Sequence, residues 1–149
     1  MDDIDRELVR LLHDDGRSTY HELGKRVRLS ANTVADRVRR LRASGVVSGV
    51  HARVDPTALG RTLHMISDVR LRESTDRAEF ERGLRAIPQV VSGARLTGDY
   101  DYQLRLACTT PAEFESTIDT LKHSHGVLQL RSRLVLHDLP LDATGLLGA

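Results

Sequence analysis

Residues 18–42 read STYHELGKRVRLSANTVADRVRRLR, and this stretch decides the fold of the first third of the chain. Thr19 and Glu22 have the spacing of a capping box, which opens a short helix. Ser30 is a good N-cap for the next helix, and Gly45 is suited to end that helix in a left-handed conformation. The stretch therefore predicts two helices joined by a tight turn.

The second of these helices has an apolar side and a polar side. Its apolar stripe is formed by Val34, Val38 and Leu41. At about 100° per residue, the opposite side carries Asn32, Asp36, Arg39 and Arg40, flanked by Thr33. An earlier helix, with the apolar stripe Ile4, Leu8, Leu11 and Leu12, precedes the pair. A helix, a tight turn and a second helix form the helix-turn-helix arrangement, in which the second helix lies in the major groove of DNA. The pattern alone is equally compatible with an ordinary packing unit of three helices.

Positive charge gathers in the same segment. The whole chain carries a formal net charge of +1. Residues 25–42 contain seven basic side chains against the single acid Asp36, so this window carries +6 and the rest of the chain −5. A solvated helix face would also explain the charge, but its position on the expected recognition helix favours DNA.

Two short apolar runs after Gly45, at 46–50 and 51–54, are candidates for the strands of a wing. Asp55-Pro56 then interrupts the pattern, and the hydrophobic period changes after it. We therefore expect a winged helix-turn-helix DNA-binding domain at 1–54, a linker at 55–62, a second domain at 63–137 and a loose tail at 138–149.

The second domain alternates strands and helices. The apolar pattern predicts strands near 63–71, 90–96, 102–108 and 128–136, and helices near 80–87 and 111–121. The order β-α-β-β-α-β is ferredoxin-like, so we expect an α+β fold with both helices on one face of a four-stranded antiparallel sheet. The other face needs a cover, which favours a homodimer through this domain.

Composition and missing motifs exclude several classes of protein. Cys108 is the one cysteine, so no internal disulfide is expected. The acidic start does not resemble a secretory signal, and the apolar runs are too short to cross a bilayer, so we expect a cytoplasmic protein with no membrane partner. There is no phosphate-binding glycine loop, dinucleotide fingerprint or hydrolase motif, and only His123 and His125 lie close together. The sequence therefore predicts no cofactor, no metal and no enzymatic activity.

Short motifs in both halves match one family. In the first half they are Asp-Gly-Arg at 15–17, Glu22-Leu23, Leu29-Ser30, Arg37-Val38-Arg39-Arg40-Leu41, Gly45-Val46-Val47 and the linker Asp55-Pro56 with Leu59-Gly60. In the second half they are Ile87-Pro88-Gln89-Val90, Thr97-Gly98-Asp99-Tyr100-Asp101-Tyr102, Phe114 and Gly126-Val127. Through these motifs, residues 1–137 resemble the Lrp/AsnC family, the leucine-responsive or feast/famine regulators.

The resemblance implies a winged helix-turn-helix joined to a regulatory domain that binds an amino acid, in dimers that commonly assemble further into octamers. It implies DNA contacts, carried over by position, from Tyr20, Ser30, Asn32, Thr33, Asp36, Arg37, Arg39 and Arg40. It places the small-molecule effector between subunits, at the interface of the regulatory domains, with contacts from Thr97, Gly98, Asp99, Tyr100, Asp101 and Ser132.

The chemistry of the loop at 97–101 suits a free amino acid. Backbone N–H groups of its glycine-containing turn can bind a carboxylate, and Asp99 or Asp101 can take the ammonium group. An ordinary hairpin turn is the alternative. Family members commonly have Thr-Arg-Thr in the last strand where this chain has Leu130-Arg131-Ser132, so one hydroxyl is kept and the pocket becomes more apolar.

Together these features predict a sequence-specific transcriptional regulator that binds double-stranded DNA and is modulated by an amino acid. Two alternatives stay open. Some proteins that resemble this family are sirohaem decarboxylases, so an enzyme on the same fold is one. An architectural DNA-binding protein without an effector is the other. The basic helix favours DNA over a tetrapyrrole.

Overall fold

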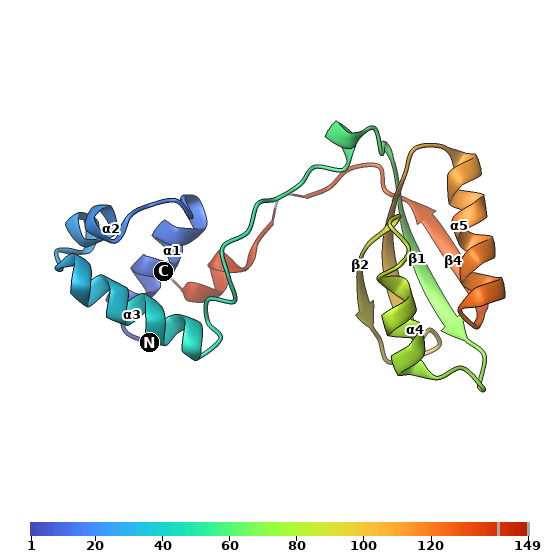
Figure 1. Ribbon diagram of the computed structural model, residues 1–149, viewed down its shortest axis with the longest axis horizontal. Coiled ribbons are helices and arrows are strands. Elements are labelled where there is room, and N and C mark those ends of the chain that lie inside the picture. Colours follow the sequence, from blue (N-terminus) through green and yellow to red (C-terminus); the bar gives the residue numbers. More distant parts are fainter. Residues whose placement is uncertain (140, 149) are drawn as a thin grey trace. The chain divides into compact units, whose positions relative to one another are not determined.

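The computed structural model describes residues 1–139 and 141–148, which form two compact units (Figure 1). The helical unit comprises residues 1–53 and 141–148, and the sheet unit comprises residues 54–139. Pro140 and Ala149, which fall in the expected tail, lie outside the described residues. Each unit has its own apolar core, as is typical of separate domains.

Three helices make up most of the helical unit: α1 (Asp3–Asp14), α2 (Tyr20–Val27) and α3 (Ala31–Ala43). Each is preceded by a side chain that accepts a hydrogen bond from the backbone of its first turn; these caps are Asp2, Thr19 and Ser30. The core between the helices contains the buried side chains Leu8, Leu23, Val34 and Val38. The three helices predicted from capping residues and apolar spacing are confirmed.

Two residues make the turn between α2 and α3 tight. Arg28 ends α2 with φ 57° and ψ 44°, the left-handed conformation, and it is the one non-glycine residue with positive φ in the described part of the chain. Gly24 approaches the turn so closely that a Cβ there would stand 2.5 Å from the carbonyl oxygen of Leu29. The N–H of Leu29 in turn donates to the carbonyl of Gly24 at 2.9 Å. The local backbone thus fixes the path of the chain into α3.

The two strands expected at 46–50 and 51–54 are not formed, so the expectation of a wing is wrong. These runs are contiguous, and an antiparallel hairpin needs about two further residues to reverse the chain. The segment packs back on the helices instead. The N–H of Val47 donates to the carbonyl of Leu41 at 3.1 Å, and Val50 occupies the space beside Gly16, where a Cβ would meet its Cγ1 at 2.4 Å.

The end of the chain also differs from the expected loose tail. Asp142 caps a 3-10 helix, Ala143–Leu147, that belongs to the helical unit and contacts α1. The imidazole Nε2 of His13 lies 3.4 Å from a carboxylate oxygen of Asp142, and Arg10 donates a hydrogen bond to the carbonyl of Gly148. In this C-terminal segment small and apolar residues alternate without forming the apolar stripe of an amphipathic helix. The sequence of the segment therefore did not predict these contacts.

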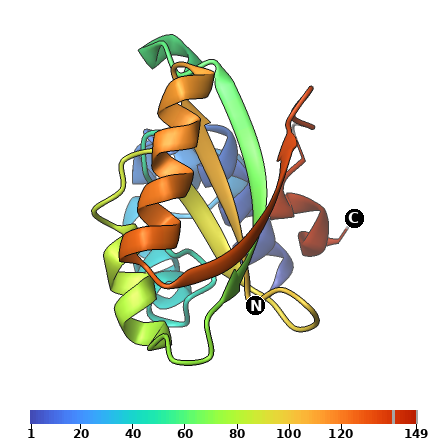
Figure 2. The same ribbon diagram turned by 90° about the vertical axis from the view of Figure 1, so that its right-hand side faces the viewer.

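The sheet unit has the predicted β-α-β-β-α-β order. Its elements are β1 (Leu63–Leu71), α4 (Arg77–Leu84), β2 (Val90–Arg95), β3 (Tyr102–Cys108), α5 (Pro111–Ser124) and β4 (Val127–Leu134). The strands form one antiparallel sheet in the order β2-β3-β1-β4. Both helices cover the same face of this sheet, as Figures 1 and 2 show. The ferredoxin-like prediction is confirmed.

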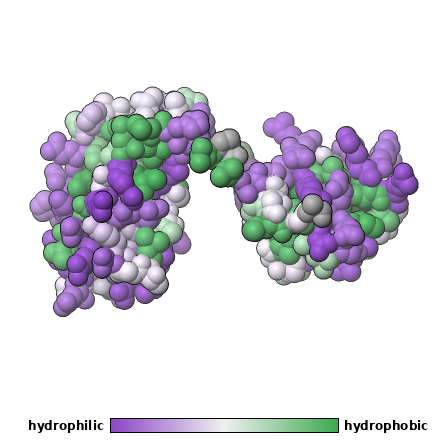
Figure 3. Space-filling view, turned by 180° about the vertical axis from the view of Figure 1, so that it is seen from behind, coloured by the Kyte–Doolittle hydropathy of each residue, from purple (hydrophilic) through white to green (hydrophobic). Residues whose placement is uncertain are grey.

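The two faces of the sheet have different chemistry. Between the sheet and the helices lies an apolar core that includes Val69, Leu104, Leu106 and Leu121. The opposite face, here called the open face, carries Ile66, Asp68 and Arg70 of β1, Gln103 and Arg105 of β3, and Arg131 and Arg133 of β4. Figure 3 shows this side of the unit as hydrophilic atoms around a smaller hydrophobic area. In the described part of the chain no helix is long and apolar enough to span a membrane.

Candidate nucleic-acid interface and effector loop

Helix α3 presents the polar side that the sequence predicts. Val34, Val38 and Leu41 face the core and are buried. Asn32, Thr33, Asp36, Arg39 and Arg40 are all exposed. The separation follows from the helical repeat, because residues three and four apart share a face. An exposed face with amide, hydroxyl and guanidinium groups has the donors and acceptors that base edges and phosphates require.

Arg37 differs from its neighbours on α3 because α1 holds its guanidinium. Its Nη1 lies 2.7 Å from Oδ2 of Asp2 and 2.8 Å from Oδ1 of Asp5, and the side chain is only 18% exposed. The hydrogen bond with Asp2, and then that with Asp5, raises the pKa of Arg37, and the bond with Arg37 lowers the pKa of Asp2. Arg37 therefore joins α3 to the start of α1, whereas the family resemblance implied a DNA contact.

The other predicted residues of this region divide into capping and exposed groups. The hydroxyl of Ser30 accepts from the N–H of Thr33 at 3.2 Å and lies 2.8 Å from the Thr33 hydroxyl, so Ser30 organises the start of α3. Asp36 and Arg39 form an exposed ion pair of 2.8 Å, which water screens strongly. Tyr20, the first residue of α2, is 38% exposed.

Five basic side chains around α3 are exposed and lie in no ion pair within the described residues: Lys25, Arg26, Arg28, Arg40 and Arg42. Of these, only Arg40 was predicted from the sequence to contact DNA. Arg28 differs from the other four in its left-handed backbone conformation. An arginine in this conformation costs conformational energy that glycine would avoid. Apolar periodicity carries no information about that backbone angle.

The loop at 97–101 is a mixture of exposed and engaged residues. Thr97, Gly98 and Asp99 are exposed, and Gly98 has φ +103°, as a turn that favours glycine requires. Asp101 is engaged: its Oδ2 accepts from the N–H of Leu71 at 2.8 Å and its Oδ1 lies 3.3 Å from Nη2 of Arg77. The bond from Leu71, followed by that from Arg77, lowers the pKa of Asp101.

The structure does not join Ser132 to this loop. The hydroxyl of Ser132 lies 2.7 Å from that of Ser67, which is buried on the helix-covered side of the sheet. Within the described residues, no hydrogen bond connects Ser132 with any residue from 97 to 101. Tyr100 is half-buried beside Asp101. The candidate effector residues thus fall in two places, the loop and the interior of the sheet.

A cavity of 220 Å³ adjoins the loop at Asp101. Three arginines line it: Arg70, Arg72 and Arg77. They outnumber the two acids in the lining, Glu73 and Asp101, so the cavity favours an anionic group such as a carboxylate. Sequence reasoning missed these arginines, because they lie on β1, the β1–α4 connection and α4 rather than in the loop motif.

Other reactive side chains have structural surroundings. Cys108 is buried on β3, and burial raises the pKa of its thiol, which makes it a small core residue. Among the residues that the structure describes, no group of three or more His, Cys, Asp or Glu side chains could hold a metal ion.

Comparison with known proteins agrees with this arrangement. A family model for the AsnC-type helix-turn-helix domain matches residues 1–42, and a model for the Lrp/AsnC ligand binding domain matches residues 65–142. The Bkd operon transcriptional regulator of Pseudomonas aeruginosa is 33% identical over 95% of this chain and 94% of its own length. The transcriptional regulator LrpA of Mycobacterium tuberculosis is 34% identical over the same shares of the two chains.

Solved structures show the same likeness. A transcriptional regulator of Neisseria meningitidis, crystallised as a complex with L-Met, is 31% identical to this chain with a TM-score of 0.86 over 97% of this chain and 95% of its own. The crystal structure of the M. tuberculosis leucine response regulatory protein has a TM-score of 0.81 at 32% identity, covering 96% of this chain and 97% of its own. From the two matched domains and these relatives, the chain belongs to the Lrp/AsnC family of transcriptional regulators.

Proposed function

We propose that this chain controls transcription by binding double-stranded DNA through the exposed face of α3, and that an amino acid modulates this binding. The observation that carries the proposal is the outward polar face of α3, opposite the buried Val34, Val38 and Leu41. The naming of its relatives as transcriptional regulators supports a regulatory rather than a catalytic role, in the cytoplasm, where the DNA is.

Within this proposal the residues of the interface have different tasks. Asn32 and Thr33, near the start of α3, read base edges, as is usual for the N-terminal part of a recognition helix. Arg40, with Arg28 and Arg42 beside it, binds phosphates and positions the helix. Asp36, Arg39 and Tyr20 complete the exposed surface, and Ser30 holds the N-terminus of α3 in place. Arg37 acts indirectly, because its ion pairs join α3 to the start of α1.

The effector is proposed to bind at the 97–101 loop. Asp99 is exposed and available for an ammonium group, and the arginines of the adjoining cavity suit a carboxylate. The L-Met complex of the Neisseria regulator supports an amino acid as the class of ligand. Such a ligand changes DNA binding only if it has different affinities for two states of the protein.

A second copy of the chain is proposed to cover the open face of the sheet. That face is charged, with Asp68 accepting from Gln103 at 3.0 Å and pairing with Arg133 at 2.6 Å, so a dimer made there has a polar interface. Two copies of α3 then meet half-sites one or more helical turns apart, about 34 Å for each turn. Octamers would follow from further association of such dimers.

The test is DNA binding by the purified full-length chain, measured by fluorescence anisotropy. One duplex comes from the upstream region of the gene itself, and a shuffled duplex of equal length and composition is the control. We expect tighter binding to the upstream duplex and a linear fall of the logarithm of the affinity with the logarithm of salt concentration. Equal affinity for the two duplexes would contradict sequence-specific regulation, and a shift of the Soret band of a sirohaem-type tetrapyrrole on adding the protein would point to the enzyme instead.

A further inference from the structure

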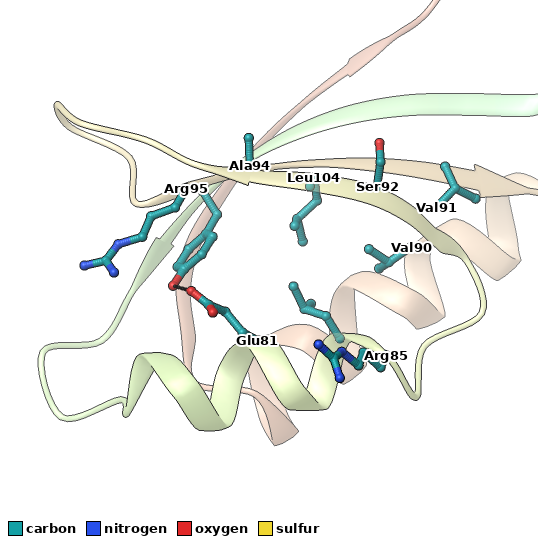
Figure 4. Close-up of a pocket in the computed structure, with 11 residues that line it drawn as sticks. Glu81, Arg85, Val90, Val91, Ser92, Ala94, Arg95 and Leu104 are labelled. Atoms are coloured by element: carbon teal, nitrogen blue, oxygen red, sulfur yellow. Dashed lines mark hydrogen bonds between the residues drawn. The ribbon is translucent and has the colours of Figure 1, made fainter. Parts of the chain in front are cut away.

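The helical unit has a cavity of 570 Å³ between α1, the segment at 46–50 and the C-terminal 3-10 helix. Aliphatic side chains from all three line it: Val9, Leu12, Val46, Val50, Leu146 and Leu147. Of the described side chains in this lining, only His13 can carry a charge. The groove between α4 and β2 in the sheet unit differs, because Glu81, Arg85 and Arg95 line it (Figure 4). The cavity of the helical unit therefore suits an apolar partner.

The C-terminal segment at 141–148 is attached to α1 at both of its ends. At one end a carboxylate oxygen of Asp142 lies 3.4 Å from Nε2 of His13, and at the other the carbonyl of Gly148 accepts a hydrogen bond from Arg10. Between these attachments Leu147 is half-buried and lines the cavity. The segment thus contributes an apolar side chain between two polar contacts, all within one chain.

The surface that receives the segment is only partly filled. Leu146 lines the cavity and yet is 88% exposed, and Val46 and Val50 are 46% and 45% exposed. The apolar core of the helical unit does not include the segment. Regions with few buried apolar contacts open locally at a low cost in free energy. The segment can therefore detach from α1 while the three helices stay folded.

The sheet unit holds the chain shortly before this segment begins. The N–H of Val135, the residue after β4, donates to the carbonyl of His64 at 2.9 Å, and Asp138 forms an ion pair with Arg105 of β3. The last attachment to the sheet unit is thus at Asp138, and the first attachment to the helical unit follows at Asp142. A very short stretch of chain therefore connects the two units when the segment is docked.

The linker at 55–62 is the other connection between the units, and it is longer between its attachments. Val50 packs beside Gly16 in the helical unit, and Arg61 lies 3.0 Å from a carboxylate oxygen of Glu113 in the sheet unit. A shorter connection leaves two bodies less freedom to move. The docked C-terminal segment is therefore the tighter of the two connections.

Helix α1 links this contact to α3. Its start holds Arg37 of α3 through Asp2 and Asp5, and its end holds the C-terminal segment through His13. The family models that match this chain end at residues 42 and 142, so residues 143–148 lie outside both. The contact therefore depends in part on residues that the family models do not cover.

We propose that residues 141–148 form a strap, which binds the α1 surface of its own chain and restricts the motion of the helical unit relative to the sheet unit. Docking of the strap requires neither DNA nor an effector. Only the use of this restriction in regulation rests on the proposed function. A helical unit with less freedom loses less of it when α3 binds a half-site, so docking of the strap favours DNA binding.

The first test is chemical cross-linking of the full-length double variant His13→Cys with Asp142→Cys, using a short bis-maleimide. The apolar contact of Leu147 and the hydrogen bond from Arg10 remain in this variant, and Cys108 is buried. We expect a link within one chain, identified by mass spectrometry of the linked peptides and by a denaturing gel without a covalent dimer.

His21→Cys with Asp142→Cys is the matched control for the cross-link, because His21 is exposed on α2 and does not line the cavity. Equal yields in the two double variants overturn the proposal, since the segment then has no fixed place on α1. A covalent dimer overturns it as well, since the segment then binds a second copy of the chain.

The second test measures how freely the helical unit rotates. A dye on His21→Cys is followed by time-resolved fluorescence anisotropy in the full-length chain. Leu147→Asp places a carboxylate against the apolar cavity and should detach the strap. We expect the amplitude of the fast rotational component to grow at least about twofold in this variant. Leu141→Asp is the matched control and should behave as wild type, because Leu141 is 83% exposed and does not line the cavity.

Asp142→Ala is a second variant that decides the matter if Leu147→Asp does not fold. It changes an exposed residue, and it removes both the contact with His13 and the cap of the 3-10 helix. A fast component that stays at the wild-type amplitude when the strap is altered overturns the proposal. Neither test uses DNA, so a failure of sequence-specific DNA binding is distinguished from a failure of the strap.

Discussion

The exposed face of α3 and the sheet unit both contain charged side chains, but those of the sheet unit have partners within the protein that the face of α3 lacks. On α3, Arg40 lies in no ion pair within the described residues, and the Asp36–Arg39 pair is exposed. In the sheet unit, Glu113 accepts from the backbone N–H and the hydroxyl of Thr109, at 2.6 and 2.7 Å, and from Gln89 at 2.7 Å. A charged group that is hydrogen-bonded within the protein stabilises the fold, whereas an exposed charged group without such bonds is available to a binding partner.

Replacing Arg40 should have the largest effect, because its charge is free. Arg40→Ala is expected to weaken DNA binding by about tenfold and to lower the slope of log affinity against log salt by about one. The melting temperature should stay unchanged. Arg82→Ala on α4 is the matched control, since Arg82 is also exposed but belongs to the sheet unit. An equal loss in both variants would remove the distinction between α3 and the rest of the surface.

Arg37 should behave in the opposite way, because Asp2 and Asp5 already hold its charge. Arg37→Gln is expected to lower the melting temperature, and the salt dependence of DNA binding should keep the wild-type slope. Asp5→Asn is the companion variant, and the double variant should lose less than the sum of the two single losses, as contacting residues do. A slope that falls by about one in Arg37→Gln would show that Arg37 contacts a phosphate after all.

Local patterns predicted which side of α3 faces water. Periodicity placed Val34 and Val38 in the core, and capping residues located the ends of the helix. The partners of Arg37 could not be predicted in this way, because Asp2 and Asp5 lie 35 and 32 residues away, at the start of another helix. A helical wheel separates polar from apolar sides, but it does not tell a free arginine from one that a distant acid holds.

The effector loop shows the same limit. The loop motif located the turn with Gly98, but the carboxylate of Asp101 is engaged by the N–H of Leu71, 30 residues earlier in the chain. The arginines beside it come from β1, the β1–α4 connection and α4, which only the folded sheet brings together. The expected wing failed for a different reason: the two apolar runs are adjacent and leave no residues between them to form a turn.

Lowering the pH should show how much the ionised carboxylate of Glu113 stabilises the sheet unit. Hydrogen bonds from the N–H of Thr109, then from Gln89 and the Thr109 hydroxyl, lower the pKa of Glu113 from 4.5 to about 2. A carboxyl whose pKa is lower in the folded state stabilises the fold above its unfolded pKa and loses that contribution as pH falls through the folded value. Glu113→Gln should therefore melt at a lower temperature than wild type at pH 7, and the difference should shrink between about pH 4.5 and 2.

Thermal unfolding followed by circular dichroism at several pH values measures this difference. Glu115→Gln is the control, because Glu115 is exposed on the same helix and none of the hydrogen bonds within the described residues involves its carboxylate. A gap between wild type and Glu113→Gln that is constant with pH would show that the substitution acts through packing and not through the bound charge.

The smallest effect on stability is expected at Arg28, a residue whose backbone conformation affects the fold and whose exposed charge is available to DNA. Its left-handed backbone favours glycine, so Arg28→Gly should stabilise the helical unit by less than about 1 kcal/mol. The same change removes an exposed charge beside α3, and the salt slope of DNA binding should fall by about one. Arg28→Lys keeps the charge and the strained backbone, so it should leave both quantities unchanged. If Arg28→Gly is more stable than wild type and binds DNA less well, the arginine contributes to phosphate binding and destabilises the fold. If Arg28→Gly is less stable than wild type, the arginine side chain itself stabilises the turn.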